Sequence, residues 1–242
     1  MRNYLFTCAV LLCFNTAVAQ DDIKEILKSH PDPKGTFYTM ESALRKPNNV
    51  LILYLADMKL NEVPLEILKF KNLEELNLDN NNIRIIPAWI SKLTKLKKLH
   101  VRKNKLNKLP SDIFSLSNLK VLDCWGNMIS YIPVIGKKNI VLEELNLSMN
   151  RINTISVNLR QLSSLKTLSL ENNHIREIPE FIFHNEKLTY LLLLHNNINT
   201  ANLKSIVRSK LKIIDLTLNP INNAEISRLR SLLPNCKIST KL

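Results

Sequence analysis

The sequence repeats one pattern of residues with a period of 23 positions, and this period constrains the fold more than any other feature. The pattern is clearest from Leu73 to Pro87, where it reads L-x-x-L-x-L-x-x-N-x-I-x-x-I-P. No residue is inserted between successive copies, so the chain is predicted to be a stack of similar units and not a ball around one central core. The eight copies begin at Val50, Leu73, Leu96, Leu119, Leu142, Leu165, Leu188 and Leu211.

Each copy also carries an asparagine, and several copies close with a proline. We predict that the asparagine is structural, because a buried amide can bond otherwise unpaired backbone groups of its own turn and of the neighbouring turn. The first copy has Met58 in this position, as is expected of an end repeat. The prolines are Pro64, Pro87, Pro110, Pro133 and Pro179. The asparagine ladder consists of Asn81, Asn104, Asn127, Asn150, Asn173, Asn196 and Asn219.

These repeats resemble the leucine-rich repeat family. The 23-residue unit, with Ile/Leu-Pro-x-x-Ile-x-x-Leu after the asparagine, is similar to the Ras-group type found in bacterial and eukaryotic scaffold proteins, and we expect an exported bacterial member. The alternation of the L-x-L segment predicts short strands that stack in parallel, with one short helical or extended segment per repeat on the opposite side. The resemblance implies an α/β solenoid, a horseshoe with a parallel concave sheet, about eight repeats and terminal caps.

We divide the chain into a signal peptide at 1–19, an N-terminal helical cap at 20–47, leucine-rich repeats at 48–233, and a C-terminal cap strand and tail at 234–242. Arg2, an apolar run and a small-residue cleavage site ending at Ala19 are typical of a secretory signal. No later apolar run approaches the roughly 18 residues that span a membrane. The protein is therefore expected to be exported, to the periplasm or out of the cell.

Amphipathic segments at both ends are expected to cover the ends of the stack. A short helix is predicted over Asp21–Lys28, and a second one is predicted to begin after Thr39 as its N-cap, with Met40, Ala43 and Leu44 facing inward. At the other end, we predict a helix from Ala224 to Leu233 and then a short strand at Pro234–Ile238.

Three repeats depart from the pattern on the return side. Gly136 and Asn139 interrupt the fourth repeat, which predicts an irregular loop there. Ser156 replaces the proline of the fifth repeat. In the seventh repeat, Thr200 to Arg208 lacks both the proline and the usual spacing, and this segment is predicted to be a helix with Leu203 facing inward.

The sequence offers little for catalysis or for cofactors. Three glycines occur in the chain, so no glycine cluster can cradle a phosphate group. Cys124 and Cys236 lie about five strand spacings apart, roughly 24 Å, which is too far for a disulfide. A strand ladder brings Ser169, His100 and Asp123 to one face only by chance, and we predict no enzyme, no metal and no cofactor. The histidines, which form no pair with metal-ligand spacing, are His30, His100, His174, His184 and His195.

Recognition is predicted on the concave face, where the outward residues of successive strands form rows. The first cluster consists of His100, Arg102, Asp123 and Trp125 on neighbouring strands. Trp and Arg commonly anchor interfaces. A second cluster is an apolar patch of Tyr190, Leu192, Leu194 and Ile213, which self-association or the C-terminal tail could also cover. Ordinary surface variation remains the alternative for the first cluster. The predicted partner-binding residues are Tyr54, His100, Arg102, Asp123, Trp125, Glu171, Tyr190, Leu192 and Leu194.

The formal net charge of +13 raises a second interpretation. Basic residues concentrate in the third repeat, so the chain could bind an acidic glycan or cell-envelope polymer, with Trp125 stacking on a sugar ring. Nucleic acid is not expected, because interleaved stacking aromatics are missing and the basic residues spread over several surfaces. The first hypothesis is an exported, non-enzymatic and monomeric module that binds a protein partner. The basic residues are Lys92, Lys95, Lys97, Lys98, Arg102, Lys103, Lys105 and Lys108.

Overall fold

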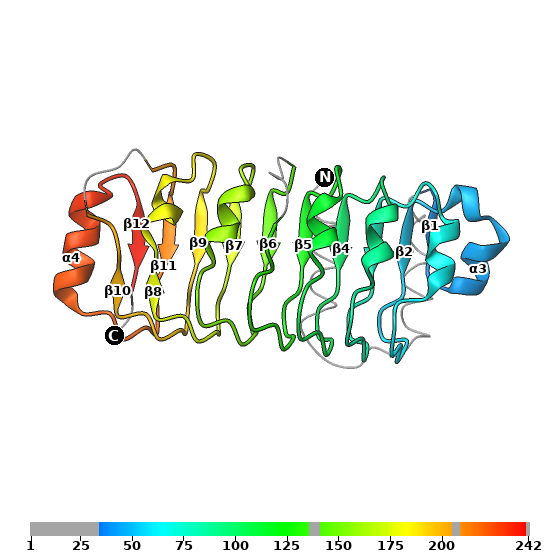
Figure 1. Ribbon diagram of the computed structural model, residues 1–242, viewed down its shortest axis with the longest axis horizontal. Helices are drawn as coiled ribbons and strands as arrows, with labels where there is room; N and C mark the ends of the chain where they lie inside the picture. The colour runs from blue at the N-terminus through cyan, green and yellow to red at the C-terminus, as the bar shows by residue number, and fades with distance from the viewer. Residues whose placement is uncertain (1–33, 136–140, 205–208, 241–242) are drawn as a thin grey trace, which may run out of the picture. The chain divides into compact units, whose positions relative to one another are not determined.

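A short strand from each repeat joins one long sheet, as the L-x-L pattern predicts. The computed structural model describes residues 34–135, 141–204 and 209–240. Within the unit that begins at Phe37, Figure 1 shows the strands standing side by side in chain order. In sheet order the strands are β1 (Thr36–Phe37), β2 (Ile52–Tyr54), β3 (Glu75–Asn77), β4 (Lys98–His100), β5 (Val121–Asp123), β6 (Glu144–Asn146), β7 (Thr167–Ser169), β9 (Tyr190–Leu192), β11 (Ile213–Asp215) and β12 (Lys237–Ser239).

The pairing of the strands is parallel and follows the 23-residue period without a slip. Leu53 pairs with Leu76, and Leu76 pairs with Leu99. These middle residues are fully buried, while the residues on either side of them in each strand point to the other face. Because a slip of one residue would turn the leucines outward, the apolar pattern itself fixes the register.

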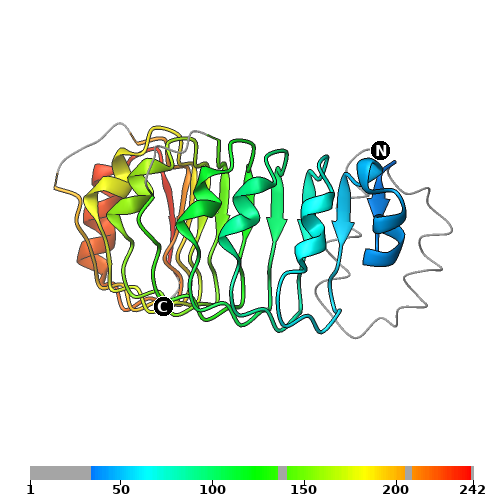
Figure 2. The same cartoon turned by 45° about the vertical axis from the view of Figure 1, so that its right-hand side comes forward.

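Most of the described return segments contain a short 3₁₀ helix, and Figure 2 shows these helices next to one another, alongside the strands. Pro87 precedes the helix of the second repeat, and its carbonyl accepts a hydrogen bond from the N–H of Ile90 at 3.0 Å. The buried side chains of Ile90 and Leu93 lie three residues apart, which suits a helix with three residues per turn. The 3₁₀ helices are η1 (Pro47–Asn49), η2 (Leu65–Lys69), η3 (Ala88–Lys92), η4 (Ser111–Ser115), η5 (Val157–Gln161) and η6 (Glu180–His184).

One continuous apolar core lies between the sheet and the return segments. It is made mainly of leucine and isoleucine from every repeat, and Phe70 and Phe183 are its largest buried side chains. In the fifth repeat, Ser156 takes the place of the proline and its side chain accepts a hydrogen bond from the N–H of Asn158 at 3.2 Å. A capping serine thus begins η5 where a proline begins most of the others.

The N-terminal cap contains the helix α3 (Met40–Arg45), with Thr39 as its N-cap, as predicted. Ala43 is buried and Met40 packs against the core, but the prediction for Leu44 was wrong, because its side chain is 36% exposed. A helix of six residues is too short to bury a wide stripe, and Ala43 alone fills its inward position. The predicted signal peptide and the predicted helix at Asp21–Lys28 lie outside the described residues.

The C-terminal cap contains the helix α4 (Asn223–Leu232) and the last strand, β12. Both were predicted, with the strand displaced to Lys237–Ser239. Cys124 is buried and Cys236 is partly buried, and both are free thiols, as the strand spacing predicted. Among the described residues, no helix is both long and apolar enough to cross a membrane.

The predicted helix in the seventh repeat was wrong for the part of it that the structure describes. Thr200–Ala201 is instead a strand, β10, which pairs in parallel with β8 (Glu177–Ile178). The side chain of Glu225 accepts the N–H of Ala201 at 2.9 Å, and Arg228 donates to the carbonyl of Ala201 at 2.6 Å. Tertiary bonds from α4 therefore hold this backbone extended. The irregular loop predicted at Gly136 and Asn139 lies outside the described residues.

Candidate binding surface on the sheet

Three rows of outward side chains run across the sheet, and their alignment follows directly from the strand register. The first row precedes the buried strand leucine: Ile52, Glu75, Lys98, Val121, Glu144, Thr167, Tyr190 and Ile213. The second row follows it: Tyr54, Asn77, His100, Asp123, Asn146, Ser169, Leu192 and Asp215. The third row lies two residues further: Ala56, Asp79, Arg102, Trp125, Ser148, Glu171, Leu194 and Thr217. We call these three rows the sheet face.

The asparagine ladder supports one edge of the sheet face. Asn104 is typical: its Oδ1 atom accepts the N–H of Ile83 at 2.9 Å, and its Nδ2 atom donates to the carbonyl of Leu78 at 2.9 Å in the preceding repeat. Nδ2 also donates to the carbonyl of Arg102 at 3.0 Å, within its own repeat. All seven asparagines bond in this manner through backbone atoms. The ladder side chains thus bond to the backbone, and the sheet face consists of other residues.

The residue before each ladder asparagine has a left-handed backbone conformation, with a positive φ. Such a conformation favours glycine, yet glycine occupies it only at Gly126, with φ of +70°. Asparagine or aspartate, which tolerate the left-handed region, occupy some of the other copies. Met149 (φ +52°) and Leu218 (φ +57°) have no such tolerance, and both are exposed. The turn that ends each strand is therefore fixed by the repeat geometry even where the residue does not favour it.

Arg102 is held between two buried carboxylates. Its Nε atom donates to Oδ2 of Asp123 at 2.7 Å, and its backbone N–H donates to Oδ1 of Asp79 at 2.6 Å. Asp123, predicted to contact a partner, is only 5% exposed, so its main contact is Arg102 and not solvent. Burial raises the pKa of Asp79 to about 6, against the lowering effect of the hydrogen bond and charge of Arg102.

Glu75 connects the first three strands of the sheet face. Oε1 accepts a hydrogen bond from the Tyr54 hydroxyl at 3.4 Å, and Oε2 lies 3.1 Å from Nζ of Lys98. Nε2 of His100 is 3.9 Å from Oε1, and burial lowers the pKa of His100 in spite of the nearby carboxylates. Tyr38 stacks on Tyr54 with ring centroids 5.4 Å apart. These contacts fix the positions of the side chains on the first three strands.

Trp125 is half-buried and lies in the third row, between Arg102 and Ser148. Its backbone N–H donates to Oδ1 of Asp123 at 3.1 Å, and Nζ of Lys103 lies 5.6 Å from the ring centroid. The predicted cluster of His100, Arg102, Asp123 and Trp125 thus spans two adjacent strands that the structure brings together. Its carboxylate and guanidinium are paired, and the indole ring is its accessible apolar part.

The second predicted cluster is less exposed than its sequence indicated. Tyr190 is 39% exposed, while Leu192, Leu194 and Ile213 are half-buried. Burial raises the pKa of Glu171, and the charge of Asp215 raises it further. Glu171 therefore lies close enough to Asp215 for their charges to interact, on either side of the strand that carries the leucines.

Ser169, His100 and Asp123 do not lie together on the sheet face. His100 pairs in register with Asp123, but Asn146 separates Asp123 from Ser169. No group of three or more His, Cys, Asp or Glu side chains among the described residues could hold a metal ion. The outward side chains of this surface are hydrogen-bonding, charged and apolar groups.

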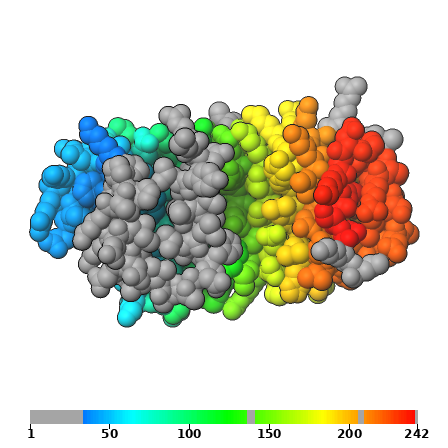
Figure 3. All heavy atoms as spheres, turned by 180° about the vertical axis from the view of Figure 1, so that it is seen from behind, coloured from blue at the N-terminus to red at the C-terminus, as the bar shows by residue number. Residues whose placement is uncertain are grey.

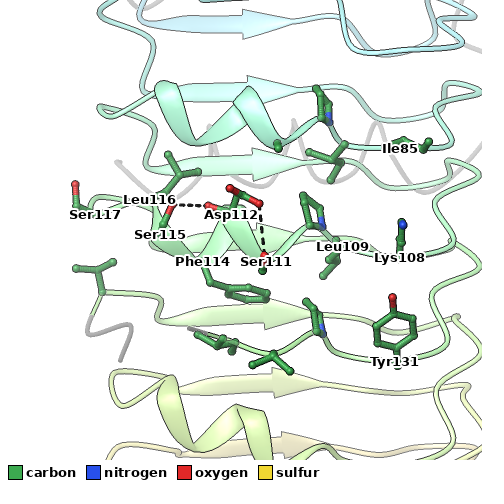
Figure 4. A pocket seen from close by; sticks show the side chains of 18 residues that line it. Ile85, Lys108, Leu109, Ser111, Asp112, Phe114, Ser115, Leu116, Ser117 and Tyr131 are labelled. Carbon is green, nitrogen blue, oxygen red and sulfur yellow. Dashed lines mark hydrogen bonds between the residues drawn. The ribbon is translucent and has the colours of Figure 1, made fainter. Parts of the chain in front are cut away.

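A hollow of about 1280 Å³ lies among the return segments, and the sequence did not predict it. Figure 4 shows Phe114, Leu109, Ile85 and Tyr131 around it, with the Ser115 hydroxyl donating to the carbonyl of Asp112 at 2.6 Å. Ile85 and Tyr131 are 59% and 52% exposed. They occupy the same position of two repeats, which is Glu, Lys, Thr or Asn in the other copies. Large apolar residues at this otherwise polar position are the sequence signal that predicts the hollow.

Comparisons with known proteins agree with this architecture. A family model described as leucine rich repeat matches residues 48–106, and one described as leucine rich repeats (2 copies) matches residues 140–183. No curated protein matches the sequence.

Several solved structures are similar to this chain to different degrees. A plant peptide hormone receptor, RGFR1 in complex with RGF2, is similar with a TM-score of 0.63 and 27% identity, over 85% of this chain and 34% of that chain. A TDR receptor is similar with a TM-score of 0.59 and 22% identity, over 75% of this chain and 37% of that chain. A Leptospira interrogans LRR protein has a TM-score of 0.40 and 19% identity, over 86% of this chain and 100% of that chain.

The chain thus spans about a third of the length of the two receptors. The strand register, the ladder of asparagines and the two family models lead to the same assignment. The chain is a leucine-rich repeat protein.

Proposed function

We propose that this protein is a non-enzymatic binding module that recognises a protein or peptide partner through its sheet face. The observation that carries the proposal is the alignment of three outward rows on one continuous parallel sheet. A surface made of rigid strands, with its side chains already bonded to one another, loses little conformational freedom when a partner binds. Trp125 and Tyr190 supply accessible aromatic surface, which commonly anchors protein interfaces.

The comparison structures support a polypeptide partner. The receptor RGFR1, 27% identical to this chain over the matched region, was solved in complex with RGF2. By analogy, we propose that the concave side of this solenoid, lined by the sheet face, receives the partner. The analogy concerns the mode of binding only, since the residues of the sheet face differ from repeat to repeat and define their own partner.

The alternative partner, an acidic glycan or envelope polymer, has less support. Lys98 and Arg102 were its expected contacts on the sheet face, and they are paired with Glu75 and Asp123. An acidic polymer would have to displace the carboxylates that form ion pairs with these two side chains. The pairing therefore favours a polypeptide over a polyanion as the occupant.

We also propose export of the mature chain from Gln20, as a monomer, on the basis of the signal-like sequence that ends at Ala19. N-terminal sequencing of protein recovered outside the cytoplasm would test this. A first residue of Gln20 supports export with cleavage, whereas recovery of an intact Met1 terminus from the cytoplasm would contradict it.

The binding proposal is tested by capture of partners from extracts with the purified protein. A double variant, Trp125→Ala with Tyr190→Ala, should lose the partners that the unaltered protein captures at high salt. The matched control, Tyr131→Ala with Val134→Ala, alters two exposed apolar residues on the opposite side and should capture them normally. Capture that disappears in high salt and on charge reversal at Lys98 and Arg102 would instead support the acidic polymer.

A further inference from the structure

The charge on the sheet face is opposite in sign to the charge of the chain. The whole sequence has a formal net charge of +13. On the sheet face from β2 to β11, however, six residues are acidic and two are basic. The acidic residues are Glu75, Asp79, Asp123, Glu144, Glu171 and Asp215, and the basic ones are Lys98 and Arg102. The basic residues of the chain therefore lie mainly outside this surface.

The two halves of the sheet face differ in how their carboxylates are satisfied. From β2 to β5, Glu75 pairs with Lys98, and Asp123 pairs with Arg102. From β6 to β11, the three rows contain Glu144, Glu171 and Asp215 and no Lys, Arg or His. In the part of the chain that the structure describes, these three carboxylates form no ion pair. Lys237 on β12, the strand beyond β11, pairs in register with Ile213.

Apolar side chains separate these carboxylates. Leu194 lies beside Glu171 in the third row, and Leu192 pairs in register with Asp215 in the second row. Glu171 and Asp215 are two strands apart, on the order of 10 Å across the sheet. Tyr190 stands exposed in the first row of the same strand as the leucines. Figure 3 shows these repeats side by side from behind, from yellow-green to orange.

This combination fits one kind of side chain well. Lysine and arginine each have an apolar stem and a cationic end, so the stem can lie on leucine while the charge reaches a carboxylate. Burial raises the pKa of Glu171, and the charge of Asp215 raises it further, so a nearby cation would favour its charged form. A cation placed between Glu171 and Asp215 would relieve the repulsion of the two carboxylates.

We propose that the surface from β6 to β11, which we call the acidic-apolar surface and define by Glu144, Glu171, Asp215, Tyr190, Leu192 and Leu194, binds a cationic segment of a partner polypeptide. The segment presents a lysine or arginine between Glu171 and Asp215, with an apolar or aromatic neighbour on Tyr190. This inference rests on the proposed function, because it specifies the chemistry of the partner on the same sheet face. It excludes the acidic polymer from this half of the surface.

The test uses immobilised synthetic peptides of constant length and constant leucine and tyrosine content, whose net charge varies from strongly negative to strongly positive. Binding of the purified protein should rise with positive charge. The double variant Glu171→Gln with Asp215→Asn should weaken binding of the cationic peptides by about tenfold or more. The substituted Asn retains an Oδ1 atom for the Thr217 N–H, which Asp215 now accepts at 3.0 Å.

The matched control is Glu62→Gln with Glu186→Gln, which removes two exposed carboxylates outside the sheet face and changes the net charge equally. It should leave binding unchanged. Equal loss in both double variants, binding that follows negative charge, or no binding of cationic peptides would overturn the inference. Partner capture that requires Trp125 and Tyr190 but not Glu171 and Asp215 would overturn it while leaving the proposed function intact.

Discussion

The Oδ1 atom of Asp79 accepts a hydrogen bond at 2.6 Å from the backbone N–H of Arg102, the residue one repeat further along the same row. Asp79 is only 8% exposed, and burial raises its pKa to about 6 from the ordinary value of an aspartate near 4. The protonated carboxyl is therefore more favoured in the folded chain than in the unfolded chain. The folded chain binds more protons than the unfolded chain between pH 4 and 6, so the contribution of Asp79 to stability falls as pH rises through this window.

We expect Asp79→Asn to raise the free energy of unfolding at pH 7 by on the order of 2 kcal/mol and to have little effect near pH 4. The substituted amide oxygen can still accept the Arg102 N–H. Denaturant unfolding from pH 4 to 8 measures the difference between the two proteins. This difference isolates Asp79 from His100, whose lowered pKa acts with the opposite sign as pH falls. A carboxyl carbon of Asp79 that titrates near pH 4 by NMR would contradict the prediction.

The asparagine ladder predicts a large and position-dependent cost of truncation. Asn150 accepts the N–H of Ile129 at 2.9 Å and donates to the carbonyl of Cys124 at 3.1 Å, and both partners are buried. Asn150→Ala leaves these groups without a partner, which should lower the free energy of unfolding by about 3 kcal/mol or more. Asn219→Ala should cost less, since the side chain at this last ladder position is more exposed.

The control for the ladder is Asn197→Ala, at the exposed position that directly follows a ladder asparagine. Surface substitutions of this kind usually change stability by less than about 0.5 kcal/mol. Denaturant unfolding followed by circular dichroism measures all three variants. Equal effects of Asn150→Ala and Asn197→Ala would show that the ladder bonds do not stabilise the stack.

The left-handed turn predicts two substitutions with opposite effects on stability. Gly126 has φ of +70°, and a Cβ atom there would lie 3.6 Å from the backbone nitrogen of Lys103, an ordinary contact. Gly126→Ala should therefore lower the free energy of unfolding by about 1 kcal/mol through backbone conformation alone. Met149→Gly should raise it by up to about 1 kcal/mol, because Met149 is exposed and has φ of +52°.

Arg151→Gly is the control for the turn, since Arg151 is exposed and is not among the residues with positive φ. It should lower the thermal unfolding midpoint, as a glycine does in most positions. If Met149→Gly lowers the midpoint as much as Arg151→Gly does, the left-handed strain assigned to Met149 is absent.

The C-terminal cap depends on an ion pair that also holds the seventh repeat. Arg228 donates to Glu225 and to the carbonyls of Leu203 and Ala201. Its bond to Glu225 lowers the pKa of that carboxyl. Arg228→Met should lower the free energy of unfolding by on the order of 2 kcal/mol, because backbone carbonyls lose a charged donor. Arg230→Met, on the same helix with one weaker bond at 3.3 Å, is the control.

Hydrogen exchange locates the effect of Arg228→Met. The amides of Ala201 and Leu203 should exchange faster in this variant, whereas those of β3 and β4, at a distance of several repeats, should not change. Faster exchange along the whole sheet would mean that the pair stabilises the stack globally and not its last repeats.

The period of the sequence predicted the sheet because each repeat buries the same leucines. Leu53, Leu76 and Leu99 pair in register without insertions, so the position of every outward residue could be assigned from the sequence alone. The helix after Thr39 could be predicted for a similar local reason, since a capping hydroxyl and an inward alanine lie a few residues apart. These features depend on neighbours within the repeat or exactly one repeat away.

The features that could not be predicted depend on more distant or finer contacts. Ala201 is extended because Glu225 and Arg228, more than 20 residues later, bond its backbone. In the candidate site, the rows were predictable but the exposure within them was not. Asp123 is buried by the guanidinium of Arg102, and Leu192 is half-buried by its neighbours on the sheet. Such contacts depend on side-chain conformation, which the period of the sequence does not predict.

Each ladder asparagine bonds only to backbone atoms of its own repeat and of the repeat before it. The same bonds can therefore form in any repeat, whatever the number of repeats before it. Removing or duplicating one 23-residue segment would restore the same bonds at the new junction and would move the two halves of the sheet face closer together or further apart. The length of this binding surface can therefore change in whole repeats, during evolution or by engineering, without any change in the rules that fold it.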